Sequence, residues 1–276
     1  MTPGSLRRIR LIAGSTLREA SRQRVFGLLL LVTMAFALGA RALGDFNFGA
    51  SELKFTADLG LGALSFFGSL LAIAGTVQTV FAETEQRTIQ MIFVRPVSRL
   101  EFVAGKLAGM QLTLGLFCLL ILLALGLVLW SRASGLLPAT AGLGAGGAGL
   151  SPSGLMLAVG AQWLKCGVLT AAMLLLCGIT RSRLVAIGAG VMLLIIFHAQ
   201  PILAGIGQHE TSGRLKWIAQ SVAWLFPDFQ RFDLSSAVFF GRSMGPGEGL
   251  GLMLHGFVFI AGYVMLAAYS FRGRED

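Results

Sequence analysis

The chain has 276 residues, of which 55% are hydrophobic and 13% are charged, whereas a soluble domain carries about 25% charged residues. This composition excludes a soluble globular domain, a disordered chain, a coiled coil and a disulfide scaffold, and it defines an integral membrane protein. The net charge of +9 would indicate a nucleic-acid partner in a soluble chain, so the positions of the charges decide its meaning here.

Residues 1–24 are predicted to form a cytoplasmic amphipathic helix that lies in the membrane interface and leads into the first span. Apolar or small residues recur every three or four positions, with arginines on the other face: Leu6, Ile9, Ile12, Ala13, Thr16, Leu17 and Ala20. The alternative is a signal peptide cleaved near Ala-Arg-Ala at 40–42. It is disfavoured because its basic segment would be 24 residues long and is itself patterned.

Six stretches with few or no charged residues come close to, or exceed, the roughly 20 apolar residues that a helix needs to cross the bilayer core. They are residues 25–40, 59–82, 107–131, 154–180, 184–206 and 249–271. The glycine-rich residues 135–154 are predicted to form a flexible outer loop. The expected fold class is therefore an all-α membrane protein with six transmembrane helices in a single transmembrane domain, residues 1–276.

Basic residues are distributed unequally between the segments that flank these spans. With a cytoplasmic N-terminus, the inner segments hold 14 Lys and Arg and the outer segments hold seven, while acidic residues divide six to seven. Because basic residues concentrate on the cytoplasmic side of membrane proteins, both termini are predicted to be cytoplasmic. The excess charge then faces the lipid bilayer and its anionic headgroups, and no nucleic-acid partner is expected.

The most informative segment is residues 83–106, between the second and third spans. A helix leaves the second span and is stopped by Arg95-Pro96, because the residue before proline is pushed out of helical geometry. Ser98 and Glu101 are then predicted to form a capping box, in which each side chain bonds the backbone amide of the other residue. The result is a stiff cytoplasmic elbow. The alternative is an ordinary inner loop, which also needs charges and caps.

Several residues inside the spans also carry information. Gly105 and Gly109, one turn apart at the start of the third span, permit another helix to approach closely. Lys165 lies about eleven residues into the fourth span, where an ionisable group indicates a substrate path or an intramembrane partner. Alternatively, Lys165 marks the membrane interface together with a nearby tryptophan. His198 and His255 lack the spacing of metal ligands, so no metal site is predicted.

The outer segment between the fifth and sixth spans, residues 207–248, is unusually long. Leu215–Phe226 is apolar but too short to cross the membrane, which is typical of a re-entrant or interfacial helix. Trp217 and Trp224 are seven residues apart and therefore share one face of that helix. Asp233 is positioned to cap a second short helix. The alternative is an amphipathic surface hairpin with no gating role.

The elbow resembles the cytoplasmic loop of type-2 ABC transporter permeases. The resemblance is carried by a Glu-x-Glu-x-x-Thr-Ile run, then Arg-Pro-Val-Ser-Arg, then Glu-Phe-Val-x-Gly-Lys, all within residues 83–106. The six-span layout and the Phe-Pro-Asp-Phe run at 226–229 agree with it, so that the resemblance covers essentially the full chain. The chain is similar in particular to the branch that includes the permease of the copper-processing system for nitrous oxide reductase maturation.

The resemblance implies that the elbow is a coupling helix, which sits in a cleft of a separate cytoplasmic ATPase. The residues expected to carry this coupling are Glu83, Glu85, Arg87, Arg95, Pro96, Ser98, Arg99 and Glu101. The resemblance also implies an outer gate in residues 207–248. The expected gate residues are Trp217, Trp224, Phe226, Pro227, Phe229 and Phe232. Lys165 is the candidate for a residue of the substrate path.

The function that follows is the permease subunit of an ABC exporter in the bacterial cytoplasmic (inner) membrane, paired with a second copy or a related permease. The sequence contains no Gly-x-x-x-x-Gly-Lys-Ser/Thr loop to cradle nucleotide phosphates. We therefore expect the chain itself to be neither an enzyme nor a cofactor carrier, with ATP and Mg bound by the partner ATPase. The alternative is an ATP-independent secondary transporter or channel, for which inverted repeats and several intramembrane charges are typical.

Overall fold

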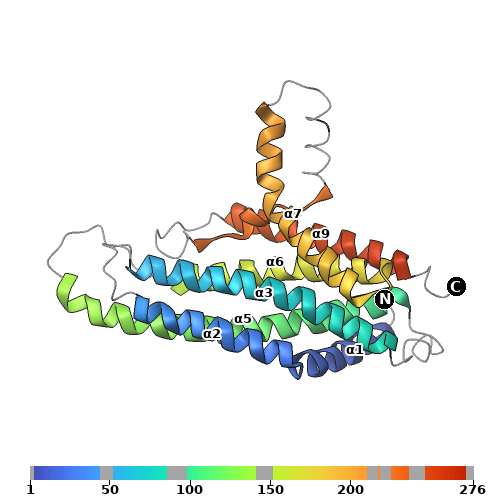
Figure 1. Cartoon of the computed structure of the whole chain (residues 1–276), viewed down its shortest axis with the longest axis horizontal. Coiled ribbons are helices and arrows are strands. Elements are labelled where there is room, and N and C mark those ends of the chain that lie inside the picture. Colours follow the sequence, from blue (N-terminus) through green and yellow to red (C-terminus); the bar gives the residue numbers. More distant parts are fainter. Residues whose placement is uncertain are drawn as a thin grey trace.

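The structure is a computed structural model of the whole chain, and it describes residues 3–43, 52–85, 98–140, 152–209, 217, 225–235 and 246–271. Its elements are α1 (Pro3–Ser21), α2 (Arg24–Leu43), α3 (Glu52–Glu85), α5 (Arg99–Thr140), α6 (Pro152–Ile179), α7 (Arg183–His209), the 3-10 helix η1 (Phe229–Phe232) and α9 (Pro246–Ser270). The long helices run along the long axis of the molecule in Figure 1, and α1 begins at the end of the bundle at which α9 finishes. The predicted all-α class is confirmed for these described residues.

Five of the described helices are long and apolar enough to cross a membrane: α3, α5, α6, α7 and α9. A sixth span is reached if α1 and α2 are taken together as one bent pair. The bend between Ser21 and Arg24 is 63°, and the Gln23 amide donates to the Ala20 carbonyl there, which closes a tight 3-10 turn. The predicted amphipathic segment and the first apolar segment are therefore two distinct helices.

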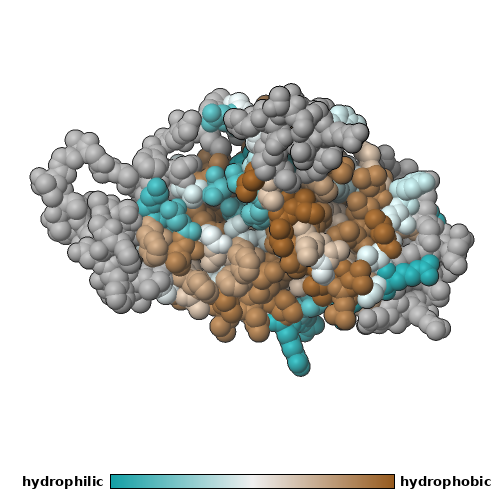
Figure 2. All heavy atoms as spheres, turned by 45° about the horizontal axis from the view of Figure 1, so that its top comes forward, coloured by the Kyte–Doolittle hydropathy of each residue, from teal (hydrophilic) through white to brown (hydrophobic). Residues whose placement is uncertain are grey.

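Helix α6 lies at the centre of the bundle. It packs against α3, α5, α7 and α9, and 78% of its apolar span segment is buried inside the protein. The corresponding share for α9 is 17%. Figure 2 shows the consequence on one face of the molecule, where hydrophobic side chains form a broad exposed surface. Such a surface suits contact with lipid, because the bilayer core accommodates apolar side chains but offers no hydrogen-bond partners to polar backbone groups.

Four of the buried threonines satisfy their hydroxyl groups within their own helices. Thr33, Thr76, Thr113 and Thr170 each donate to the carbonyl oxygen four residues earlier, at 2.6 to 3.0 Å. A hydroxyl bonded in this way adds little cost to an apolar interior, because it leaves no donor without an acceptor. These threonines are therefore part of the core, in contrast to the polar side chains around the cavity described below.

Helix α5 is longer than predicted. It runs to Thr140, so the prediction of a flexible loop over residues 135–154 is wrong for its first six residues, while residues 141–151 lie outside the described part. The physical reason is that one glycine in a helix costs only about 1 kcal/mol, and Leu136 and Leu137 continue the apolar pattern beyond Gly135. A single glycine is too weak a signal to end a helix that is already 36 residues long at that point.

Helix α7 changes direction near the outer end of its span. Its apolar span segment ends at Ile202, and Pro201 lies inside the helix. Proline removes one backbone hydrogen bond and its ring clashes with the preceding turn, which bends a helix. In Figure 1 the last part of α7 accordingly turns away from the other helices.

Candidate functional site

The start of α5 is fixed by the predicted capping box. The backbone amide of Ser98 donates to Oε2 of Glu101 at 3.0 Å, and the backbone amide of Glu101 donates to Oγ of Ser98 at 3.3 Å. Both bonds of the reciprocal pair are present, so two amides at the helix start that would otherwise lack partners are satisfied. The capping box predicted from the sequence is confirmed.

The same carboxylate also binds α1. Nη2 of Arg8 donates to Oε1 of Glu101 at 3.0 Å, and the Glu101 side chain is only 9% exposed. Glu101 therefore accepts bonds with both oxygens, one from its own helix start and one from a residue 93 positions earlier. Arg8 was not singled out by the sequence analysis, because no local pattern distinguishes it from the neighbouring arginines.

One turn further along, Lys106 joins α5 to two other helices. The residue is fully buried, and its Nζ donates to the backbone carbonyl of Thr79 in α3 at 3.1 Å. The carboxylate of Glu19 in α1 lies 4.0 Å from the same nitrogen. A buried ammonium is costly unless it is paired and hydrogen-bonded. Its position therefore fixes the mutual arrangement of α1, α3 and α5.

The glycine pair beside Lys106 has the close contact that was predicted for it. A Cβ atom at Gly105 would lie 2.8 Å from Cβ of Ile12, and a Cβ atom at Gly109 would lie 2.5 Å from Cβ of Thr16. The helix that approaches is thus α1, from the same chain. We call the contact among α1, the end of α3 and the start of α5 the inner junction, and define it by Arg8, Glu19, Thr79, Glu101, Lys106, Gly105 and Gly109.

The other predicted coupling residues are described only in part. Glu83 and Glu85 occupy the last turn of α3, with no description of their side chains. Arg99 is the first residue of α5 and is half-buried. Arg87, Arg95 and Pro96 lie outside the described residues. The structure thus brings Ser98 and Glu101 into one capped unit at the inner junction.

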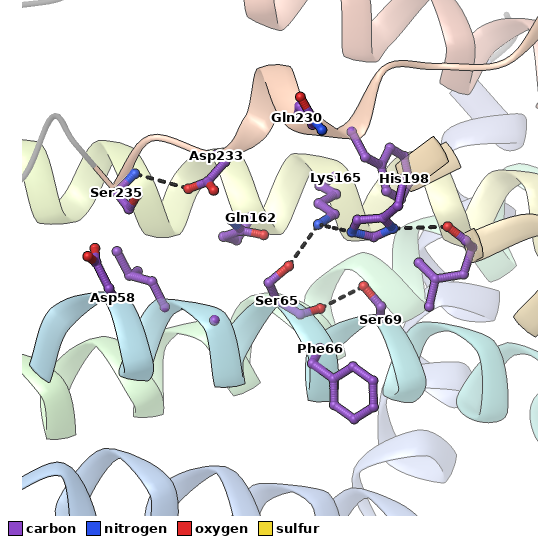
Figure 3. Close-up of a pocket in the computed structure, with 14 residues that line it drawn as sticks. Asp58, Ser65, Phe66, Ser69, Gln162, Lys165, His198, Gln230, Asp233 and Ser235 are labelled. Atoms are coloured by element: carbon purple, nitrogen blue, oxygen red, sulfur yellow. Dashed lines mark hydrogen bonds between the residues drawn. The ribbon is translucent and has the colours of Figure 1, made fainter. Parts of the chain in front are cut away.

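A polar cavity of about 520 Å³ lies elsewhere in the bundle, between α3, α6, α7 and η1. Figure 3 shows that its polar side chains come from opposite walls and point toward one another. The lining residues are Asp58, Leu61, Gly62, Ser65, Phe66, Ser69, Gln162, Lys165, Leu194, His198, Phe229, Gln230, Asp233 and Ser235. Such a density of polar side chains is unexpected between apolar helices, and it makes this cavity the second candidate site.

Lys165 is held at one end of the cavity. Its Nζ donates to Oγ of Ser65 at 2.7 Å and lies 3.2 Å from Nε2 of His198. Nδ1 of His198 lies 2.9 Å from the carbonyl oxygen of Leu194. A carbonyl only accepts, so Nδ1 carries the proton, and Nε2 of a neutral ring accepts from the lysine. The positive charge therefore resides on Lys165.

The lysine side chain is 4% exposed, and Nζ also lies 5.1 Å from the centre of the Phe229 ring. A lysine that marked the interface would extend toward water, whereas this one points into the bundle (Figure 3). The geometry therefore favours the first of the two interpretations of Lys165, an intramembrane cation with partners.

The predicted gate residues divide into two groups. Asp228 caps η1 by accepting from the Gln230 amide at 2.9 Å, and this turn buries Phe229 and Phe232, whose rings lie 6.1 Å apart. Phe229 also lies 4.8 Å from the ring of Phe197 in α7. Of these rings, Phe229 lines the cavity on the η1 side. In the same segment Pro227 is buried and Phe226 is half-buried.

The remaining gate predictions are not brought to the cavity. Trp217 is 72% exposed, and Trp224 lies outside the described residues, as does most of the predicted interfacial helix over 215–226. Asp233 accepts from the Ser235 amide at 3.2 Å, as a cap does. The helix predicted to follow it begins beyond the described residues.

Two residues that the sequence analysis missed complete the cavity. Gln162 is 5% exposed, and its Oε1, like Oδ1 of Asp58, is buried with no hydrogen-bond partner among the described residues. Gln162 stands one turn before Lys165 in an otherwise apolar helix, and that spacing was an available signal. Asp58 immediately precedes the predicted second span, residues 59–82, and the sequence analysis gave it no role.

A bundle of membrane-spanning helices that encloses a buried cation and a polar cavity defines a multi-pass membrane transport protein. The family model for ABC-2 family transporter proteins matches residues 11–275, nearly the whole chain. The chain belongs to this family. It is therefore the membrane permease subunit of an ABC transporter, a subunit that transports and that functions with an ABC ATPase. No curated protein matches the chain.

Proposed function

We propose that this chain is the permease of an ABC exporter in the bacterial cytoplasmic membrane, with both termini cytoplasmic, and that its ATPase docks on residues 83–106. The observation that supports this proposal best is the inner junction. The start of α5 is capped by Ser98, bound to α1 through Arg8, and bound to α3 through Lys106. A partner that pushed on the elbow would therefore push on three helices at once.

The length of α5 explains how such a push would travel. The helix has 42 residues and, at 1.5 Å per residue, extends about 60 Å, twice the thickness of the hydrocarbon core. A continuous helix resists compression along its axis, because shortening it would require backbone hydrogen bonds to break. Displacement of the capped end would thus move the opposite end of α5 by a similar amount.

The remaining parts of the transporter follow from the same proposal. A second copy of the chain, or a related permease, completes the transport path, since the helices of one subunit pack around α6 and fill its centre. The cover of that cavity, with Phe229 and Phe232, serves as an outer gate. Membership of the branch that serves nitrous oxide reductase maturation belongs to this proposal and rests on the elbow motif.

The test is a charge reversal of the elbow in the full chain with its ATPase. We expect the Glu83→Lys/Glu85→Lys double variant to insert into the membrane at the normal level but to lose co-purification of the ATPase, and transport-coupled ATP hydrolysis with it. Arg183→Glu is the matched control, because it reverses an exposed charge in the α6–α7 turn at the same end of the bundle. Unchanged ATPase binding and hydrolysis in the double variant would show that docking occurs elsewhere.

Family membership disfavours the alternative of an ATP-independent transporter or channel, although the buried Lys165 taken alone favours it. Transport measured with an inactive ATPase subunit distinguishes the two functions. An exporter of the proposed kind loses transport when the ATPase subunit carries a substitution that abolishes hydrolysis, whereas an ATP-independent transporter keeps it.

A further inference from the structure

The polar cavity has two ends of opposite charge. Lys165 supplies the positive end, and the carboxylates of Asp58 and Asp233 line the negative end. In Figure 3 Gln162 lies between them, and the two carboxylates approach from α3 and from the segment after η1. Asp233 is close enough to Lys165 to act on it electrostatically, but no hydrogen bond or ion pair of the described residues joins the lysine to either carboxylate. The cavity is therefore incomplete as a structural salt bridge.

At the positive end, the lysine ammonium has one N–H donor that neither Ser65 nor His198 uses. No carboxylate of the described residues lies within 4.0 Å of Nζ, and its partners are a hydroxyl, a neutral imidazole and an aromatic ring. Ser65 accepts from the lysine, so the Ser65 hydroxyl hydrogen is available to a further acceptor. An anionic group placed here would pair with the ammonium of Lys165 and accept from Ser65.

At the negative end, acceptors lack donors. Oδ1 of Asp58 and Oε1 of Gln162 are buried with no partner within the described part of the chain. The charges nearest to Asp58 are Lys54, one turn earlier on α3, and Asp233. Arg231, the basic residue of η1, pairs with Asp228 at 3.3 Å. Asp58 and Asp233 thus present two carboxylates at this end of the cavity, and a bound ammonium group would pair with them.

We propose that this cavity binds a small, elongated zwitterion, with its anionic group at Lys165 and its ammonium group at Asp58 and Asp233. Gln162, which is 5% exposed and has an unpaired oxygen, accepts a hydrogen bond from the middle of the ligand or from its ammonium group. Short peptides and ω-amino acids have this chemistry.

The helix register sets the length of the ligand. Ser65, which marks the positive end, and Asp58 are seven residues apart on α3, so their Cα atoms are separated by about 10 Å along the helix axis. Both positions face the cavity, because seven residues are close to two full turns. An α-amino acid such as glycine is too short to bridge this separation. A cavity of about 520 Å³ has room for a ligand of the required length.

This site is a property of one chain, and it depends on neither the ATPase nor the direction of transport. The test is therefore isothermal titration calorimetry on the purified full chain in detergent micelles. The probe is 6-aminohexanoate, with glycine as the short zwitterion and hexanoate and hexylammonium as singly charged controls. We expect 6-aminohexanoate to bind at least tenfold more tightly than each of the other three.

Substitutions at each end of the cavity test which group of the ligand binds there. Lys165→Met and Asp58→Asn should each weaken 6-aminohexanoate at least tenfold, and Asp58→Asn should also abolish the preference for 6-aminohexanoate over hexanoate. Arg183→Gln removes an exposed positive charge outside the cavity and should leave the affinity unchanged. If Lys165→Met fails to fold, the Asp58→Asn comparison still decides, because Asp58 is only partly buried.

The proposal is overturned if no zwitterion binds, or if hexanoate binds as tightly as 6-aminohexanoate and both are insensitive to Asp58→Asn, which would define a simple anion site. The source of the zwitterion is read from competition. Displacement of 6-aminohexanoate in nanodiscs of phosphatidylethanolamine, but not in nanodiscs of phosphatidylglycerol, would overturn the length argument, because the ammonium and phosphate of that headgroup are too close together to bridge the two ends. Equal affinity in both would identify a soluble zwitterion.

Discussion

The contact between α1 and α5 provides the sharpest test of the inner junction. Alanine at Gly109 would place a Cβ atom 2.5 Å from Cβ of Thr16 and 2.8 Å from the backbone oxygen of Ala13. Backbone atoms cannot rotate away as the end of a side chain can, so α1 itself has to move. Gly126 is on the same helix, and a Cβ atom there would meet nothing within 4 Å. It is therefore the matched control.

The expected magnitude combines two terms of opposite sign. Replacing glycine by alanine in a helix stabilises it by at most about 1 kcal/mol, and this gain applies to both positions. Overpacking of a close contact costs about 1–3 kcal/mol, and this loss applies to Gly109 alone. The two variants should therefore differ by about 2 kcal/mol, with Gly126→Ala the more stable.

The protein carries its own probe for this measurement. Cys118, Cys166 and Cys177 are buried thiols, so a thiol-reactive fluorescent maleimide reacts only when the fold opens. At roughly 2–4 °C per kcal/mol for a chain of this size, Gly109→Ala should melt about 4–8 °C below Gly126→Ala in detergent micelles. Equal melting temperatures would refute the reasoning, because they would mean that α1 does not pack against Gly109.

Three further outcomes are expected in the same thermal assay. A double-mutant cycle on Arg8 and Glu101 should give a coupling of about 1 kcal/mol, since the arginine side chain is 36% exposed and its charge is screened. Lys106→Met should accumulate in the membrane, whereas Lys106→Glu should not, because a carboxylate there would face the Thr79 carbonyl with no donor between them. Phe229→Ala should cost about 3–5 kcal/mol, because the ring is 1% exposed and lies against the rings of Phe197 and His198.

Features that depend on local chemistry were predicted well from the sequence. The capping box needs only Ser98 and Glu101 at the right spacing, and the structure contains both of its hydrogen bonds. The close approach at Gly105 and Gly109 needs only two small residues on one face. The capping box and the glycine pair each depend on residues within one or two helical turns. Both can therefore be predicted from the sequence without knowing which helix packs against them.

Features that depend on which helices meet were not predictable in the same way. The apolar pattern of α1 groups Leu6 with Ala20 on one face, yet Leu6 is 60% exposed while Ala20 is buried. Hydrophobicity cannot distinguish contact with lipid from contact with protein, because both environments are apolar. The partners of Lys165 come from α3 and α7, and no spacing within α6 reveals them.

Helix α3 connects the inner junction with the cavity. The carbonyl of Thr79 accepts from Lys106, and Ser65, fourteen residues earlier on the same helix, accepts from Lys165. The two sites are thus about 21 Å apart along one continuous helix, with no proline between them. A displacement of the inner end of α3 along its axis would therefore move Ser65 relative to Lys165 by nearly the same distance. Because a shift of about 1 Å already weakens a hydrogen bond of 2.7 Å, motion at the junction is sufficient to alter the hold on a ligand in the cavity.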